Sequence, residues 1–370
     1  MPYQVFQHWD RLKTCVVGSS YDPRFYDWIQ DTETRRRFQV LAEETEEDFQ
    51  SLIQLLQRFD VTVVRPNNSQ QCQIGHRWVP PPVTPRDYFV MIHDRLWIPS
   101  EPNQAHSVKA FERQKELDWN QWHQQDQALH QAKLTCYQNI FDQVAQQGNE
   151  ICCTDLDVVS GCFVTRLGQD LYFATQRPDE DQSQLLDRVN TVFPHTHNRI
   201  VDAQGHGDAT YCAVTPGLIV SLRDVPTYAD TFPDWEVVYL EPSDFANTRQ
   251  FRDCMKLNRG RWYVPGFEQD TNLRHIVEHY FDSWVGHAAE TVFDVNILVI
   301  DQHNIVVSSH CDAVERACAR YGVEVHVSPF RHRYFWDAGI HCITNDLDRD
   351  GTIKKYFTHD SNKYTTESLT

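Results

Sequence analysis

The chain has 370 residues, and its 34 basic and 52 acidic side chains give a formal net charge of −18. Hydrophobic residues make up 41% and aromatic residues 12%, which is enough for a packed core and excludes disorder over the whole chain. The acidic balance opposes nucleic-acid binding, and no apolar run is long enough to span a membrane.

The first residues and the cysteines indicate the compartment. The N-terminal sequence lacks the charged start and apolar stretch of a signal peptide. Eleven cysteines, an odd number, are therefore expected to be reduced thiols, most of them buried and one of them reactive. We predict a cytoplasmic protein, and a homodimer is compatible with the sequence.

One type of unit recurs along the chain: an apolar strand, a tight turn, a second apolar strand, an amphipathic helix and a further strand. The first unit has a strand at 12–17, a helix around 49–59 and a strand at 61–64. Later strand pairs are predicted at 88–92 with 96–99, 162–166 with 171–174, 210–214 with 218–222, and 295–300 with 305–308. Helices are predicted at 109–147, 185–192 and 314–321, with Gly322 ending the last of them before a strand at 323–328.

These units, about five in number, are similar in plan and unequal in length. Closed into a ring, they would form one α/β domain of this size. The alternative that the pattern leaves open is an open mixed α/β sheet. We treat residues 1–370 as a single catalytic domain with a core at about 10–358 and a C-terminal tail at 359–370.

Two local patterns resemble metal sites. His275, Glu278 and His279 match an inverted zinc-peptidase signature, but the charged and aromatic neighbours favour a surface helix. The acidic run that starts at Asp346 resembles a calcium loop, but Phe357 stands where that loop needs a bidentate glutamate. We therefore predict a polar turn at 346–351 and no metal site.

Four short segments combine reactive side chains with glycines or strand ends, at 84–88, 166–170, 205–210 and 337–342. Any one of these segments alone is better explained by a structural role than by a catalytic one, since aspartate is common in turns and cysteine in cores. Together they supply one cysteine, one histidine and three carboxylates. A nucleophilic cysteine needs a nearby histidine, and two carboxylates can hold a planar guanidinium cation.

The same segments resemble, in order and approximate spacing, the signature segments of the amidinotransferases. They read Pro-Arg-Asp at 85–87, Arg-Leu-Gly-Gln-Asp at 166–170, His-Gly-Asp-Ala-Thr at 206–210 and Gly-Ile-His-Cys at 339–342. The family belongs to the guanidino-group-modifying (pentein) superfamily, and the resemblance extends over about 10–358. It implies a pseudo-fivefold α/β propeller of five ββαβ-type units.

The resemblance also implies roles for individual residues. Cys342 would be the nucleophile and His206 the general acid and base, with Asp170 orienting His206. Asp87 and Asp208 would hold the guanidinium of the donor. Arg223 is the nearest candidate to bind the donor carboxylate, although it lies about two positions from where the family motif places that arginine.

The sequence departs from the family pattern at two places in these segments. Residues 337–339 read Asp-Ala-Gly where the family has a pair of glycines, and residues 160–162 read Ser-Gly-Cys where the family has Asp-Ala-Ala. Small residues that some members use to bind the donor fall near 289–290. We expect the reaction chemistry to be intact and the acceptor pocket to be unusual.

The implied activity is transfer of the amidino group from L-arginine to an amine acceptor by a ping-pong mechanism through an amidino-cysteine. Both substrates are small molecules, and no cofactor and no metal is expected. Two alternatives remain: a hydrolase of the same superfamily, in which water replaces the amine, and an inert member that only binds guanidines. The sequence does not identify the acceptor.

Overall fold

The computed structural model describes residues 2–68, 71–100, 118–175, 181–203, 205–222, 228–241, 244, 267, 269–281, 284 and 293–358. No helix within these ranges combines the length and the apolar character needed to cross a bilayer.

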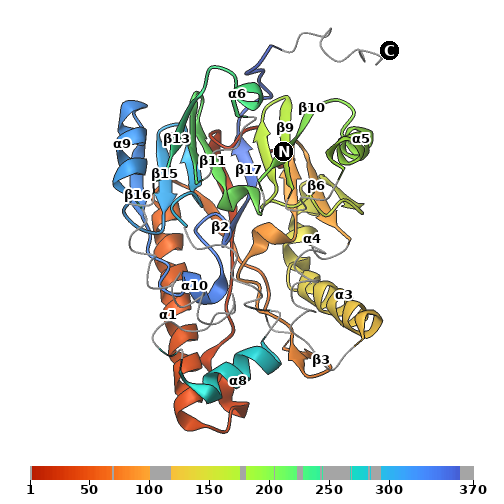
Figure 1. Cartoon of the computed structure of the whole chain (residues 1–370), viewed down its shortest axis with the longest axis vertical. Helices are drawn as coiled ribbons and strands as arrows, with labels where there is room; N and C mark the ends of the chain where they lie inside the picture. Colours follow the sequence, from red (N-terminus) through yellow and green to blue (C-terminus); the bar gives the residue numbers. More distant parts are fainter. Residues whose placement is uncertain are drawn as a thin grey trace.

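The described residues form five three-stranded sheets and one two-stranded sheet. In each three-stranded sheet the middle strand is antiparallel to one neighbour and parallel to the other. Both ends of the chain contribute to the first sheet, since β17 pairs with β1. Most strands lie in the upper half of Figure 1, while helices α1, α3 and α8 reach below them.

The sheets, with their strands in spatial order, are the following: β17 (Thr344–Asp350), β1 (Arg11–Val17) and β2 (Thr62–Val64); β5 (Val90–Ile92), β6 (Arg95–Pro99) and β7 (Glu150–Thr154); β8 (Val164–Leu167), β9 (Asp170–Thr175) and β10 (His197–Asp202); β11 (Tyr211–Thr215), β12 (Leu218–Ser221) and β13 (Glu236–Tyr239); β14 (Leu298–Asp301), β15 (Asn304–Val307) and β16 (Glu324–Val327); and the hairpin of β3 (Gln73–Ile74) and β4 (Arg77–Trp78).

Helices connect the middle strand of each three-stranded sheet to its parallel neighbour. These helices are α1 (Thr32–Gln57), α3 (Trp119–Thr135), α4 (Gln138–Gln146), α5 (Gln182–Val192), α6 (Tyr228–Thr231) and α9 (Asp312–Arg320). Two further helices, α8 (Thr271–Tyr280) and α10 (Arg333–Trp336), and three short 3-10 helices, η1 (Pro23–Trp28), η2 (Pro85–Asp87) and η3 (Gly207–Ala209), complete the described elements.

Helix α1 shows why these segments fold where they do. The Asp31 side chain accepts a hydrogen bond from the Thr34 backbone amide and caps the helix. Apolar side chains recur along one face, among them Phe38, Phe49 and Leu56. This face packs in the same apolar cluster as Ile340 and Cys342, so α1 supports the segment that carries the expected nucleophile.

The recurring unit expected from the sequence is confirmed in these five sheets, and the four predicted hairpins are present. Closure of the five units into a ring stays a prediction. The helix expected at 109–147 is present from Trp119 but divided into α3 and α4, and its earlier part, up to residue 117, lies outside the described residues.

The prediction of a polar turn at 346–351 is wrong. Residues Thr344–Asp350 form strand β17, and Asp346 within it is fully buried. Its acidic residues stand at alternate positions, which is the period of a strand and which short-range sequence does not distinguish from a loop of carboxylates.

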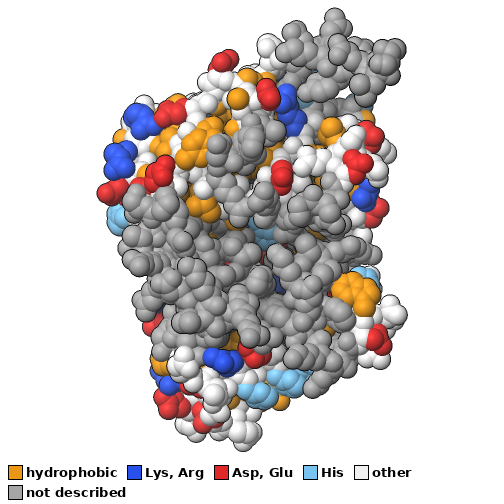
Figure 2. Space-filling view, viewed as in Figure 1, with side chains coloured by type: hydrophobic (Ala, Val, Ile, Leu, Met, Phe, Trp, Pro, Cys, Tyr) orange, Lys and Arg blue, Asp and Glu red, His pale blue; other side chains and the backbone are white. Residues whose placement is uncertain are grey.

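The described surface carries charges of both signs. On the face shown in Figure 2, the described Lys and Arg side chains are scattered and do not gather into one patch. This face therefore offers no continuous basic groove, among the described residues, to a phosphate backbone.

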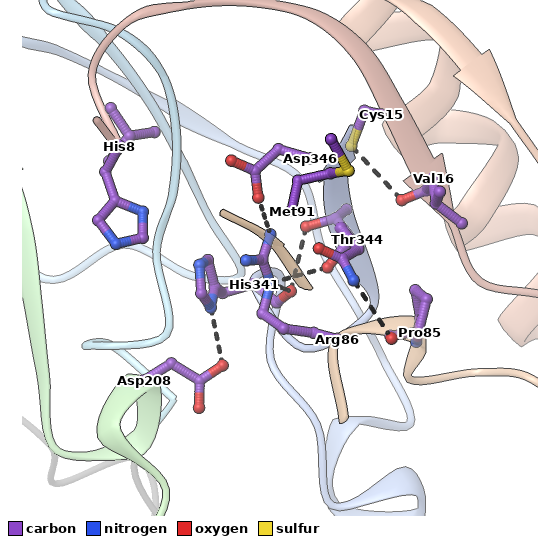
Figure 3. Close-up of polar contacts among 12 residues, drawn as sticks. His8, Cys15, Val16, Pro85, Arg86, Met91, Asp208, His341, Thr344 and Asp346 are labelled. Carbon is purple, nitrogen blue, oxygen red and sulfur yellow. Dashed lines mark hydrogen bonds and ion pairs between the residues drawn. The ribbon is translucent and has the colours of Figure 1, made fainter. Parts of the chain in front are cut away.

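Three buried arginines converge on the Asp346 carboxylate (Figure 3 shows the Arg86 side). Arg86 Nη2 lies 3.1 Å from Oδ1, and Arg349 Nε lies 2.7 Å from Oδ2. Arg166 Nη2 contacts both oxygens, at 2.9 and 2.8 Å. All four side chains are at most 2% exposed, so the cluster lies in the protein interior.

The same guanidinium groups also bind the backbone of other elements. They donate to the carbonyl oxygens of Met91, Asp10, Val299, His341 and Thr344, at 2.6–2.9 Å. These acceptors lie on or beside strands of several sheets. Asp346 and its arginines, here called the arginine hub, therefore join β17 to the neighbouring sheets.

The charges of the hub are strongly coupled. Burial alone would raise the pKa of Asp346, but Arg166, Arg349 and Arg86 together hold it well below its usual range. Burial lowers the pKa of Arg166 to about 10, against the opposing effect of Asp346. Asp346 is therefore ionised at neutral pH, and its removal would leave three buried cations with only carbonyl partners.

We expect Asp346→Asn to lower the free energy of unfolding by about 3–5 kcal/mol, because breaking a buried ion pair leaves uncompensated charge. The measurement is urea denaturation at neutral pH. Asp348→Asn, on the same strand, is the matched control, since its ion pair with Lys13 is 3.7 Å long and the Lys13 side chain is half-exposed. Equal effects of the two substitutions would show that the hub does not stabilise the fold.

Candidate active site

Cys342 lies in the turn between α10 and β17, and two side chains fix this turn from different directions. Arg86 Nε donates to the carbonyl oxygens of His341 and Thr344, at 2.8 and 2.9 Å. Asn296 Oδ1 accepts from the amides of His341 and Cys342, at 2.9 and 3.1 Å. The turn is thus held by both its carbonyl and its amide groups.

Asn296 also contacts the sulfur of the expected nucleophile. Its Nδ2 donates to Cys342 Sγ at 3.1 Å and to the Asp208 carbonyl oxygen at 3.2 Å. Gly339 makes this approach possible, because a Cβ atom there would meet the Asn296 side chain at 2.4 Å. Asn296 therefore ties the Cys342 turn to the segment of Asp208 and offers the sulfur a hydrogen-bond donor.

Asp208 brings a carboxylate to the sulfur. Its Oδ2 accepts a hydrogen bond from His341 Nδ1 at 2.7 Å and lies 3.5 Å from Cys342 Sγ (Figure 3 shows the contact with His341). Asp208 belongs to η3, whose backbone is anchored by the hydrogen bond from its amide to the Cys162 carbonyl at 3.2 Å. The predicted pair of Asp208 and Cys342 is thus brought together.

A second group of polar side chains consists of Asp87, Cys162 and His206. Ligand atoms of Asp87, Cys162 and His206 all lie within 4.8 Å of one another. One carboxylate oxygen of Asp87 is buried without a hydrogen-bond partner among the described residues. The His206 ring packs edge-on against Phe163, with centroids 5.0 Å apart.

One residue of the second group, Cys162, lines a small cavity together with Asp208 and His341 of the first. Cys162, Asp208, His341 and the buried His8 all line it. The cavity measures about 20 Å³, which is room for one water molecule. The structure therefore gathers Asp87, Cys162 and His206 with Asp208 and Cys342 in one region.

Asp170 is not part of this region. It begins β9 and pairs with Leu167 on β8 and with His197 on β10. The His206 segment instead packs at the other end of β9, where a Cβ atom on Gly207 would meet Ala174 Cβ at 3.0 Å. Four residue steps along the strand separate Asp170 from Ala174, which is about 13 Å. Strand β9 therefore carries Asp170 away from the end on which the His206 segment packs.

The structure describes only some of the other positions that the sequence singled out. Arg223 and residues 289–290 lie outside the described residues. His275 and His279 lie on α8 with stacked rings, as expected for the surface helix, and the described residues contain no group of three metal-ligating atoms that includes them.

Two residues of the site were missed by sequence reasoning. Asn296 falls within the strand predicted at 295–300, and nothing in its spacing predicted contact with Cys342. Cys162 was noted as a departure from the family pattern, and only the packing of the 160–162 turn on η2 and η3 reveals its neighbours.

The buried histidines beside the site are neutral at physiological pH. Burial lowers the pKa of His341 well below its ordinary value, and the positive charge of Arg86 lowers it further. Burial also lowers the pKa of His8 well below its ordinary value, and the positive charge of Arg166 lowers it further. The neutral form of His8 fits its contact, since its Nε2 accepts a hydrogen bond from the Arg166 amide at 3.2 Å.

Comparison with known proteins adds evidence on the fold. No family model matches the chain, and no curated protein matches it. Two solved amidinotransferases are similar in structure. One, from the saxitoxin biosynthetic pathway of Microseira wollei, has TM-score 0.63 and 15% identity over 96% of this chain and 100% of its own. The inosamine-phosphate amidinotransferase of Streptomyces griseus has TM-score 0.61 and 16% identity, over 96% and 99%.

The chain has the fold of these enzymes. Guanidine-modifying hydrolases share it with lower similarity. The N-terminal domain of an arginine dihydrolase from the cyanobacterial ornithine-ammonia cycle has TM-score 0.52 and 10% identity, over 91% of this chain and 97% of its own. At these identities the likeness concerns the fold, a mixed α/β arrangement of several small sheets that these amidinotransferases and hydrolases have in common.

Stability should fall as the pH drops below about 6.5, the ordinary pKa of histidine. The unfolded chain then binds protons at His8 and His341 that the folded chain does not, so unfolding is favoured by up to about 1.4 kcal/mol per pH unit for each. His8→Gln should remove about one such proton from the slope of unfolding free energy against pH. The measurement is urea denaturation from pH 7 to pH 5.

The control for this experiment is His195→Gln, which removes an exposed histidine and should keep the wild-type slope. If His8→Gln also keeps the wild-type slope, His8 is protonated in the folded protein and the assignment of its neutral form fails.

Proposed function

We propose that this protein is an amidinotransferase that moves the amidino group of L-arginine to an amine acceptor through an amidino-Cys342 intermediate. The observation that carries the proposal is the contact of the Asp208 carboxylate with the Cys342 thiol at 3.5 Å. Asp87 and His206, whose ligand atoms lie within 4.8 Å of each other, supply a second carboxylate and an imidazole. A shared fold with two amidinotransferases supports it.

The substrate poses a specific physical problem. A guanidinium is a resonance-stabilised cation, and its central carbon is a poor electrophile. Asp87 and Asp208 can each accept hydrogen bonds from its planar N–H groups, which neutralises the charge and fixes the plane of the cation. Because Asp208 lies 3.5 Å from Cys342 Sγ, a guanidinium held by Asp208 presents its carbon to the sulfur.

The proposed reaction then follows in two halves. Cys342 Sγ attacks the guanidinium carbon, and the bond from that carbon to the Nε atom of arginine breaks as His206 supplies a proton to the departing nitrogen. Ornithine leaves, and the amidino group stays on sulfur as a thioether. An amine then enters, His206 accepts its proton, and the new C–N bond displaces Cys342.

The proposal gives Asp87 a second role and gives Asn296 a role that the sequence did not predict. Asp87 takes over the place beside His206 that the sequence assigned to Asp170, because Asp170 lies about 13 Å along β9 from that end of the strand. Asn296, through its donor to Cys342 Sγ, helps to hold the sulfur as an anion. Arg223 stays a prediction for the donor carboxylate.

Cys342→Ser should reduce ornithine release from arginine at least about a thousandfold, because a hydroxyl is far harder to ionise than a thiol. The assay is ornithine formation in the presence of a panel of amines. Cys153→Ser, which removes an exposed thiol elsewhere, should keep activity. Substantial activity in Cys342→Ser would mean that another group is the nucleophile.

Transfer and hydrolysis are separated by a single-turnover experiment. Given arginine and no acceptor, a transferase should release about one equivalent of ornithine per chain and carry an amidino group on Cys342, because water must be kept from the intermediate. Mass analysis detects the adduct, and an acceptor amine should discharge it to form a new guanidine. Continuous citrulline or urea formation without amine would instead identify a hydrolase, and binding of arginine without any turnover would identify an inert guanidine-binding protein.

A further inference from the structure

The group of Asp87, Cys162 and His206 has a property that the transfer reaction does not use. It combines a thiol, an imidazole and a carboxylate, each offering one ligand atom within 4.8 Å of the other two. Cys162 is 2% exposed, and the other two residues are half-buried. Among the described residues, this combination lies in the interior and not on the acidic surface.

The backbone around Cys162 is firmly placed. A Cβ atom on Gly161 would meet the Arg86 side chain at 2.5 Å, so this turn packs directly on η2, which carries Asp87. The Cys162 carbonyl oxygen accepts a hydrogen bond from the backbone amide of Asp208. Asp208 lies in η3, two residues after His206. Cys162 Sγ also contacts Ser160 Oγ at 3.2 Å. Three segments that are distant in sequence thus present their ligand atoms from fixed backbone.

The spacing of the three ligand atoms is compatible with a tetrahedral metal site. Zn²⁺ binds thiolate sulfur at about 2.3 Å and imidazole nitrogen or carboxylate oxygen at about 2.0–2.2 Å, which sets the ligand atoms about 3.4–3.6 Å apart. The observed upper limit of 4.8 Å requires movements of about an ångström, within the range of side-chain rotation. Three protein ligands leave the fourth position for a water molecule.

We propose that Asp87, Cys162 and His206 form a binding site for a thiophilic divalent cation, Zn²⁺ in particular, and that the bound cation blocks the donor site. On binding, the Cys162 thiol releases its proton to solvent and the sulfur donates an electron pair to the metal. The cation occupies Asp87, which would otherwise hold the guanidinium, and His206, which would otherwise transfer the proton. This second consequence rests on the proposed function, whereas the binding site does not.

Cys162 is the residue on which metal binding depends most. Residues 160–162 read Ser-Gly-Cys where the family pattern has Asp-Ala-Ala, so a methyl group at this position would leave Asp87 and His206 as a pair. Two hard or borderline ligands bind zinc weakly, and the thiolate supplies the soft third ligand. With the Cys162 thiol the site therefore binds the cation more tightly than it would with alanine at position 162.

The test is direct metal binding by the full chain, kept reduced with a phosphine and freed of metal. Co²⁺ is added as a spectroscopic probe, because a thiolate ligand gives a sulfur-to-cobalt charge-transfer band, and Zn²⁺ is then titrated to displace it. The wild type should show one such site per chain. Cys162→Ser, which keeps the side-chain size and the contact with Ser160, should lose the band and weaken Zn²⁺ binding at least about tenfold.

Matched variants locate the metal. Cys342→Ser and Cys153→Ser should keep the band, and Cys162→Ala should behave as Cys162→Ser, with circular dichroism showing that each variant is folded. Absence of the band in the wild type, its persistence in Cys162→Ser and Cys162→Ala, or its loss in Cys342→Ser would each overturn the proposed site.

An activity measurement separates the site from the function. Zn²⁺ should inhibit ornithine release by the wild type in competition with arginine and should inhibit Cys162→Ser at least about tenfold less strongly. A cobalt band that depends on Cys162 in a protein without arginine turnover would support the metal site while the proposed function failed. Equal inhibition of the wild type and Cys162→Ser would contradict the blocking role.

Discussion

The arginine hub is the interaction on which the rest of the structure depends. A single carboxylate, Asp346, receives three guanidinium groups in the protein interior, and the same groups bind carbonyl oxygens on or beside strands of other sheets. The sheets have two or three strands each, so they expose edges and polar backbone groups that need partners. The hub satisfies several of these groups at once and fixes how neighbouring sheets meet.

The hub also determines the site, because Arg86 belongs to both. Its guanidinium contacts Asp346 and holds two carbonyl oxygens of the Cys342 turn, while the next residue, Asp87, faces His206. Burial lowers the pKa of His8 and of His341, and the buried arginines lower both further, so both histidines are neutral. The interactions that hold the sheets together thus also position the Cys342 sulfur next to the Asp208 carboxylate.

Local patterns in the sequence were sufficient to predict the recurring strand and helix units but not the arginine hub. The hairpins and helices follow from apolar periodicity and turn residues, which act over a few positions. Asp346 looked like part of a polar turn because its partners, Arg86 and Arg166, stand far away in the chain. Asp170 was assigned to His206 for the opposite reason: its motif matched, but the register of β9 carries it to the far end of the strand. Long-range pairing and register are the information that a motif lacks.

The placement of Asp87 has a consequence for the proposed reaction. In the expected arrangement one carboxylate would orient His206 and two others would hold the donor, so the tasks would be separate. Here Asp87 lies beside His206 and is also a proposed donor ligand, which couples the two tasks. In the proposed reaction the amidino group stays cationic when it moves from ornithine to the sulfur. Asp87 can therefore keep its cationic partner through transfer while His206 passes its proton to the departing nitrogen.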